Sequence, residues 1–81
     1  MMARVTVLYF ASLRDDAGVA SEQVDTFAPD LRGLYAELQA RHGFALPVEH
    51  LRAAVDGAFA RWDDVARDGS EIAFIPPVSG G

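Results

Sequence analysis

The chain has two short segments in which apolar side chains fall on both faces of a strand. Residues 4–10 (RVTVLYF) form two such faces, one with Val5, Val7 and Tyr9 and the other with Thr6, Leu8 and Phe10. β-Branched and aromatic residues favour strands, and apolar character on both faces is typical of a central strand. Residues 71–75 (EIAFI) share this character and are followed by two prolines, which cannot donate a ladder hydrogen bond. We therefore predict a central strand near each end of the chain.

A single longer segment has a helical repeat. Its apolar residues recur at i, i+3, i+4 and i+7, as Leu31, Leu34, Tyr35 and Leu38. Asp30 is placed to cap the first free N–H groups, and Gly43 is suited to the left-handed conformation at the other end. The pattern predicts a helix with one buried face. Residues 13–18 (LRDDAG) predict a short helical turn that Gly18 closes.

The remaining segments predict polar strands and tight turns. Residues 21–27 (SEQVDTF) alternate with many polar positions, which favours an edge strand. Residues 53–55 and 58–62 flank Asp56-Gly57, a pair that favours a two-residue hairpin turn because both positions accept positive φ.

Together these elements predict one domain with the order β-β-α-β-β-β. The arrangement with the simplest connections places the first and last strands side by side in the middle of the sheet, with the helix across one face. This is an α+β fold, the ubiquitin-like β-grasp, with a mixed sheet of about five strands and one main helix packed on one face. We assign residues 1–75 to this domain and residues 76–81 to an extended tail. The face with Thr6, Leu8 and Phe10 has no second helix to cover it, and an exposed apolar patch there is typical of a partner site.

Composition excludes several classes of function. Seven arginines against twelve acidic residues give a net charge of −5, which is the wrong sign for a sequence-independent nucleic-acid binder. The absence of cysteine excludes disulfides, thiol chemistry and cysteine-based zinc sites. No apolar run approaches the ~18 residues of a membrane span, and the N-terminus lacks a signal-peptide pattern. We expect a cytoplasmic protein that binds neither nucleic acid nor a membrane.

Few side chains suggest catalysis or metal binding. His42 and His50 lack a ligand spacing that zinc sites use, so we interpret them as solvated or capping residues and expect no metal. The adjacent acids at 15–16 and 63–64 favour turn and solvent positions, because neighbouring side chains point in different directions. Trp62 fits either an interface anchor or a half-buried aromatic at a strand end.

The chain ends in Pro-Pro-Val-Ser-Gly-Gly, and this tail is the strongest functional candidate. In an extended form it rises ~3.1 Å per residue and reaches about 18 to 20 Å from the domain. Gly80 and Gly81 have no side chain, so they can enter a narrow slot and present the terminal carboxylate to another protein's active site. A carboxylate activated with ATP becomes an acyl adenylate, which a sulfur or amine nucleophile can attack. A terminal Gly-Gly alone is equally typical of a frayed chain end.

Three stretches resemble the small subunit of molybdopterin synthase, the MoaD family of sulfur carriers. They are residues 8–18 (LYFASLRDDAG), 51–57 (LRAAVDG) and, most specifically, 68–81 (DGSEIAFIPPVSGG). The resemblance implies that a ubiquitin-activating-like adenylyltransferase uses ATP to adenylate Gly81, which is then converted to a covalent thiocarboxylate. It further implies no bound cofactor and a large synthase subunit as partner, in a heterotetramer of two small and two large subunits. There the sulfur would pass to cyclic pyranopterin monophosphate and form the dithiolene of molybdopterin.

The resemblance also assigns roles along the tail. Gly81 would carry the sulfur, Gly80 would be the slender spacer, and the partner's channel would hold Pro76, Pro77, Val78 and Ser79. Phe10 and Ile75, and with less support Phe59, are our candidates for the partner-facing patch. Two other functions remain open: a thiamin-type or cysteine-type sulfur carrier, and a ubiquitin-like modifier that uses the same tail for amide conjugation.

Overall fold

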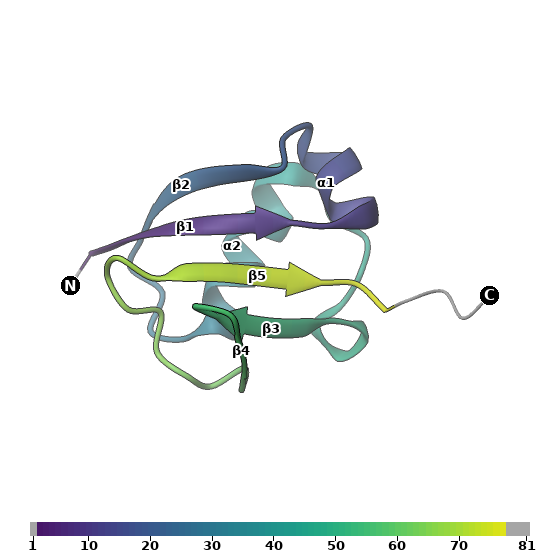
Figure 1. The fold of residues 1–81 in the computed structure, drawn as a ribbon. Coiled ribbons are helices and arrows are strands. Elements are labelled where there is room, and N and C mark those ends of the chain that lie inside the picture. Colours follow the sequence, from purple (N-terminus) through teal and green to yellow (C-terminus); the bar gives the residue numbers. More distant parts are fainter. Residues whose placement is uncertain (1, 78–81) are drawn as a thin grey trace.

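Five strands form one mixed sheet in the order β2-β1-β5-β3-β4. The structure is a computed structural model, and it describes residues 2–77. Along the chain the elements are β1 (Ala3–Tyr9), α1 (Ala11–Ala17), β2 (Ser21–Thr26), α2 (Leu31–His42), the short 3-10 helix η1 (Val48–His50), β3 (Arg52–Val55), β4 (Ala58–Ala60) and β5 (Glu71–Ile75). The predicted α+β ubiquitin-like β-grasp is thereby confirmed (Figure 1).

The first and last strands lie side by side in the middle of the sheet, as the sequence predicts. β1 and β5 pair in parallel, with Val7 opposite Ile72 and Tyr9 opposite Phe74. The polar strand β2 pairs antiparallel with β1 and forms one edge, which confirms the prediction of an edge strand. Because β1 and β5 run in the same direction, the chain enters the sheet at one end and leaves it at the other (Figure 1).

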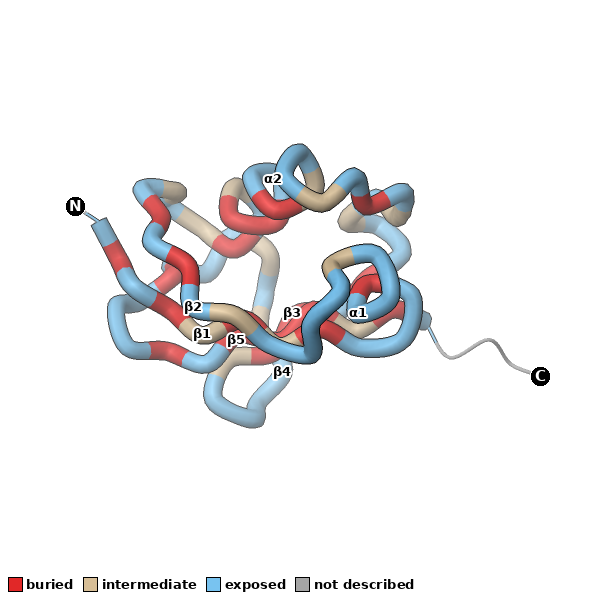
Figure 2. The backbone as a smooth tube through the Cα atoms, turned by 90° about the horizontal axis from the view of Figure 1, so that it is seen from above, coloured by how far each residue is buried: buried red, intermediate tan, exposed pale blue. Residues whose placement is uncertain are grey.

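Helix α2 covers one face of the sheet (Figure 2). It begins after Asp30, whose Oδ1 accepts a hydrogen bond from the Gly33 N–H at 2.8 Å, and it ends at Gly43, whose φ is 73°. The predicted stripe is fully buried, at Leu31, Leu34, Tyr35 and Leu38. It packs into one core with the helix-facing side chains of the strands, which include Val5, Val7, Tyr9, Ile72 and Phe74. The predicted cap, stripe and end of α2 are therefore confirmed.

The turns form where the sequence places them. Asp56 and Gly57 join β3 to β4 with φ values of 51° and 88°, as a two-residue hairpin turn requires. The Asp56 Oδ1 also accepts a hydrogen bond from the Glu71 N–H at 2.9 Å, which fixes the turn to the start of β5. Gly18 closes α1 with a φ of 79°.

Five strand ends differ from the prediction by one or two residues. β1 and β3 each begin one residue earlier than predicted, at Ala3 and Arg52, and three strands end earlier than predicted. Phe10 lies outside β1 because its carbonyl accepts a hydrogen bond from the Leu13 N–H at 3.1 Å and so belongs to the start of α1. Phe27 lies outside β2 because the Thr26 Oγ1 accepts from the Ala28 N–H at 3.0 Å and turns the chain. Trp62 lies outside β4, and its carbonyl accepts from the Arg32 N–H at the start of α2, at 3.0 Å.

Candidate functional site at the base of the C-terminal tail

The central strand β5 positions the start of the tail. After Ile75 the ladder stops, because Pro76 and Pro77 have no N–H to donate. Pro76 is buried against the domain itself, whereas Pro77 is exposed. The exposed part of the tail that the structure describes therefore begins at Pro77. The other residues predicted for the partner's channel and for the chemistry lie outside the described residues; they are Val78, Ser79, Gly80 and Gly81.

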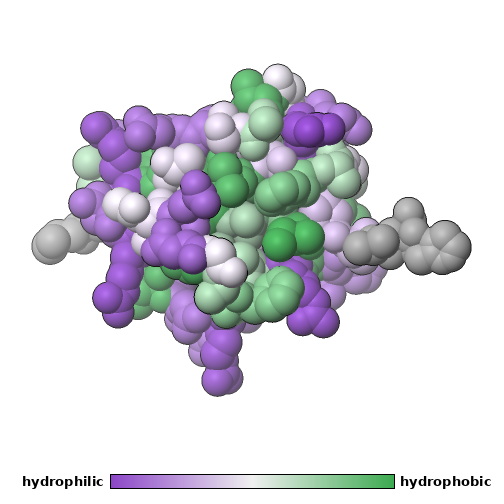
Figure 3. All heavy atoms as spheres, viewed as in Figure 1, coloured by the Kyte–Doolittle hydropathy of each residue, from purple (hydrophilic) through white to green (hydrophobic). Residues whose placement is uncertain are grey.

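The sheet face opposite α2 carries an apolar row across four strands. In the strand register Leu8 lies opposite Ala73, Ala73 lies opposite Ala54, and Ala54 lies opposite Phe59. Residues directly opposite one another project from the same face of a sheet. Figure 3 shows this face, with apolar side chains gathered over the middle of the sheet and toward the end where the tail begins.

The three predicted patch residues lie on this face. Phe10 and Phe59 are exposed, with 44% and 74% of their surface accessible. With Ile75 they line an open hollow of about 260 Å³, whose other walls are Leu8, Ala54, Gly57, Glu71 and Ala73. We name the apolar members of this set, Leu8, Phe10, Ala54, Phe59, Ala73 and Ile75, the open-face patch. Their assignment to a partner stays a prediction.

A second, larger hollow of about 740 Å³ lies beside the patch at the base of the tail. Ile75, Pro77 and Phe59 line it, together with Glu49, His50, Leu51, Arg52, Ala53, Ala60 and Trp62. Trp62 stacks on the buried Phe74 with ring centroids 5.8 Å apart, so it is a half-buried aromatic at the rim of this hollow. Arg52 is not among the site residues that the sequence predicts. Its place on the face follows from the register with Ile75, which a strand pattern alone does not reveal.

A polar cluster joins the other edge of the sheet to the end of α2. The Glu22 Oε2 accepts a hydrogen bond from the Tyr9 hydroxyl and lies 2.7 Å from the His42 Nε2. Burial tends to raise the pKa of Glu22, but the hydrogen bonds from Tyr9 and His42 and the nearby Arg41 outweigh it, so this pKa is lowered. Burial, together with the hydrogen bond to Glu22, raises the pKa of Tyr9.

This cluster corrects the interpretation of one histidine. His42 is not a solvated or capping residue, since only 15% of its side chain is accessible and it pairs with Glu22 from a strand 20 residues away in sequence. His50 is exposed, as expected. Within residues 2–77 no group of three or more histidine, aspartate or glutamate side chains is arranged to hold a metal ion.

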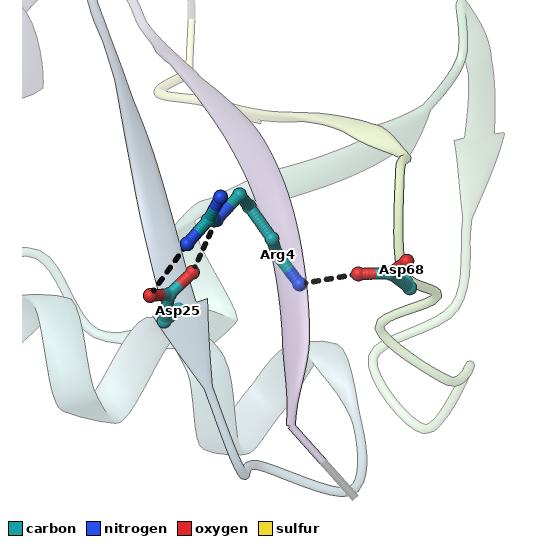
Figure 4. Close-up of polar contacts among 3 residues, drawn as sticks. All are labelled: Arg4, Asp25 and Asp68. Atoms are coloured by element: carbon teal, nitrogen blue, oxygen red, sulfur yellow. Dashed lines mark hydrogen bonds and ion pairs between the residues drawn. The ribbon is translucent and has the colours of Figure 1, made fainter.

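The end of the sheet far from the tail is held by polar contacts of structural character (Figure 4). The Arg4 Nε donates to Asp25 on β2 at 2.8 Å, and the Arg4 backbone N–H donates to Asp68 at 2.7 Å. The hydrogen bonds with Arg4 and the coulombic attraction to it lower the pKa of Asp25. The contact with Asp68 fixes the loop before β5 to the start of β1, and the contact with Asp25 joins β1 to β2. In the part of the chain that the structure describes, no helix has the length and apolar character of a membrane span.

The fold defines the class of protein, a ubiquitin-like β-grasp domain. A family model described as the ThiS family matches residues 7–81, and the chain belongs to this family. It is 35% identical over 80 residues to the molybdopterin synthase sulfur carrier subunit of Escherichia coli (strain K12), covering 95% of this chain and 99% of the relative. The Homo sapiens subunit of the same name is 35% identical over 86 residues, covering 99% and 97%.

Solved structures show the same fold in proteins of two kinds. The complex of subunits 1 and 2 of the molybdopterin-converting factor from Helicobacter pylori 26695 contains a chain that is 28% identical, with a TM-score of 0.63 and 100% of both chains covered. SAMP1 from Haloferax volcanii, a small archaeal modifier protein, is 26% identical with a TM-score of 0.78, covering 98% of this chain and 100% of that one. A ubiquitin from Caldiarchaeum subterraneum, 15% identical with a TM-score of 0.65 over 100% of both chains, shares the fold alone.

Proposed function

We propose that this chain is the sulfur-carrier subunit of molybdopterin synthase. The observation that carries the proposal is the near-complete match, at 35% identity, to subunits of that name. The geometry supports it, because β5 ends in the middle of the sheet and directs Pro77 outward beside the open-face patch. The chain is not an enzyme on its own in this proposal, since the machinery for each step belongs to its partners.

The first step is activation of the Gly81 carboxylate. Its oxygen attacks the α-phosphate of ATP in a ubiquitin-activating-like adenylyltransferase and releases pyrophosphate. Hydrosulfide at the carbonyl carbon then displaces AMP and leaves a thiocarboxylate. The chain has no cysteine, so the C-terminal carbonyl is the one place where it can carry transferable sulfur. Because activation consumes ATP, we assign this chemistry to the cytoplasm.

The second step is sulfur donation inside the large synthase subunit. The thiocarboxylate sulfur attacks an oxygen-bearing carbon of cyclic pyranopterin monophosphate, and this oxygen takes up protons and leaves as water. A second water molecule then hydrolyses the bond between the acyl group and sulfur. Sulfur stays on the pterin and Gly81 returns to a carboxylate. A dithiolene needs two sulfur atoms, so each product consumes two thiocarboxylates. The assembly in this proposal is a heterotetramer of two small and two large subunits.

Docking in this proposal uses the open-face patch and the tail together. Phe10, Ile75 and Phe59 lie on one face, and Ile75 connects this face directly to Pro76 and Pro77. Aromatic side chains covered by a partner are common anchors of interfaces. Pro76, which is buried against this domain, would stay there, and the partner's channel would hold Pro77, Val78 and Ser79, with Gly80 as the spacer before Gly81. No cofactor binds to the chain itself in this proposal.

A modifier function is the second candidate, and the similarity to SAMP1 favours it. The attacking nucleophile would then be an amine, and Gly81 would be joined by an amide bond to another protein. This chain has no lysine, so lysine-linked chains of it cannot form. A thiamin-type or cysteine-type carrier would share the thiocarboxylate with the first proposal and differ in the acceptor.

The intact mass of the protein purified from its own cells tests these proposals. We expect a species heavier by the exchange of one oxygen for sulfur, with the change mapped to Gly81. Purification without alkaline or reductive treatment preserves the thioacid. Gly81 found instead in an amide bond to another protein's lysine would favour the modifier function over sulfur carriage. If the thiocarboxylate forms, conversion of cyclic pyranopterin monophosphate with the purified large subunit distinguishes the pterin pathway from the other carriers.

A further inference from the structure

Arg52 is the only arginine that lines either hollow beside the base of the tail, among residues 2–77. It lies directly opposite Ile75 in the antiparallel pairing of β3 with β5. Because opposite residues share a face, Arg52 projects from the face that carries the open-face patch. It is thus a cationic residue next to the last strand residue before the tail.

The side chain of Arg52 is held over an aromatic ring. Its guanidinium carbon lies 5.8 Å from the centroid of the Phe59 ring, a geometry typical of a cation–π contact. Arg4, Arg41 and Arg61 each lie near a carboxylate of this chain. Within residues 2–77 Arg52, like Arg14, Arg32 and Arg67, has no such ion pair, so no carboxylate of the described residues occupies its hydrogen-bond donors.

A partner that encloses the tail has to approach across this position. Pro77, the last described residue of the tail, lines the same hollow of about 740 Å³ as Arg52 and Phe59. This hollow is continuous with the open-face patch, because Phe59 and Ile75 line both. Covering Phe59 would remove water from the guanidinium and strengthen its interaction with any carboxylate placed opposite.

We propose that Arg52, positioned by Phe59, binds a carboxylate of the large subunit at the entrance of the site that takes up the tail. This inference rests on the proposed function and adds to it the chemistry of the partner's rim. Elsewhere the chain is acidic, with a net charge of −5, and favours basic surfaces. Arg52 has the opposite preference and favours an acidic group of the partner. A non-cognate protein with a lysine or arginine at this place would be rejected by like-charge repulsion.

The test compares four proteins binding to the purified large subunit from the same organism, by isothermal titration calorimetry. We expect Arg52→Glu to weaken binding about tenfold or more, because truncated or reversed interfacial charge pairs have large effects. Arg52→Lys keeps the charge but not the planar guanidinium, so we expect its affinity to lie between those of Arg52→Glu and the unchanged protein. The matched control is Arg32→Glu on the exposed side of α2, which makes the same change in net charge on the opposite layer. We expect its affinity to stay within about twofold of that of the unchanged protein.

Two outcomes would overturn the inference. One is Arg52→Glu binding as tightly as Arg32→Glu. The other is failure of every acid-to-lysine substitution at the partner's rim to restore the binding of Arg52→Glu. Thermal unfolding by circular dichroism checks each variant, and Arg52→Leu replaces Arg52→Glu if that variant does not fold.

Failure of the proposed function gives a different result. In that case the unchanged chain itself does not bind the large subunit. The same variants are then assayed with the adenylyltransferase, where loss of pyrophosphate release with Arg52→Glu but not Arg32→Glu would move the carboxylate to that enzyme. Equal release with both variants would overturn the role of Arg52 there as well.

Discussion

Glu22 joins three elements through a single carboxylate. It lies on the edge strand β2, opposite Val7 of β1, and it contacts Tyr9 at the end of β1 and His42 at the end of α2. The side chain of Glu22 is 23% accessible, so water screens these contacts only in part. The ionised form accepts both hydrogen bonds, and this explains why its pKa is lowered despite the cost of burial.

The lowered pKa of Glu22 predicts a loss of stability in acid. The unfolded chain holds the Glu22 proton at a pH where the folded chain has released it, so stability rises with pH across this interval. The contribution is present above the ordinary glutamate pKa of about 4.3 and is lost as pH falls through the folded value. We expect Glu22→Gln to flatten the acid side of the stability curve. Urea unfolding from about pH 3 to about pH 7 measures it, and unchanged curvature in the variant would assign the acid loss to other carboxylates.

The structural roles of several residues can be predicted from the sequence because these roles depend on local chemistry. Asp30, Gly43 and Asp56-Gly57 each satisfy a need that arises within a few residues of the chain, a helix cap or a positive φ. The contact of His42 cannot be predicted in this way, because it joins residues that are distant in the sequence. Its partner Glu22 lies 20 residues away, and nothing in the spacing of the two residues indicates that α2 ends beside β2.

The helix α2 is stabilised mainly by its buried stripe, not by contacts along its exposed side. All four predicted stripe residues are completely buried against the strands. Most helical stability in proteins comes from such packing. Removing part of the stripe therefore affects the whole domain, since the core has one layer of helix and one of sheet.

Leu38→Ala tests the contribution of this stripe. We expect it to lower the free energy of unfolding by about 2 to 5 kcal/mol, because it removes buried methyl groups and leaves a cavity. Arg32→Ala is the control on the exposed side of the same helix, with an expected change within about 0.5 kcal/mol. Urea unfolding followed by circular dichroism gives both values. Equal losses for the two variants would mean that α2 is not held by its packing.

Strand patterns predict the elements and their faces, but not which residues become neighbours. Alternation places Leu8 and Phe10 on the open face, and the structure agrees. The row from Leu8 to Phe59 depends on three separate registers, and the pairing of Arg52 with Ile75 depends on one of them. A register is set by turn geometry and core packing across the whole sheet, so it emerges only with the tertiary structure.

The topology separates the core of the molecule from the proposed chemistry. All residues of the buried core lie between Ala3 and Phe74, whereas the proposed sulfur bearer is the last residue of the sequence. The parallel pair of β1 and β5 places the start of the tail at the end of the sheet opposite the first strand residue. Function and stability should therefore respond to different substitutions.

Deletion of Gly81 tests this separation. Every core contact remains in place, so we expect a thermal midpoint within about 1 °C of the unchanged chain, since terminal residues contribute little to a packed core. We also expect complete loss of thiocarboxylate formation and sulfur transfer. Differential scanning calorimetry and intact mass measure the two properties. A large drop in the thermal midpoint would show that the tail end is structural.

The net charge of −5 acts on the whole molecule and predicts how fast it meets its partners. Long-range attraction to basic surfaces raises association rates at low salt, and salt screens it over about 8 Å at physiological ionic strength. We expect association with the adenylyltransferase and the large subunit to slow as salt is added. Stopped-flow measurement of the association rates checks this. Association rates that do not change with salt concentration would contradict this prediction.

Arg32→Glu and Arg52→Glu both shift the net charge from −5 to −7, since each replaces one positive charge with a negative one. Both variants should associate with the large subunit at least as fast as the unchanged chain, because long-range electrostatic attraction governs the association rate. Only Arg52→Glu should dissociate faster, because close contacts govern the dissociation rate.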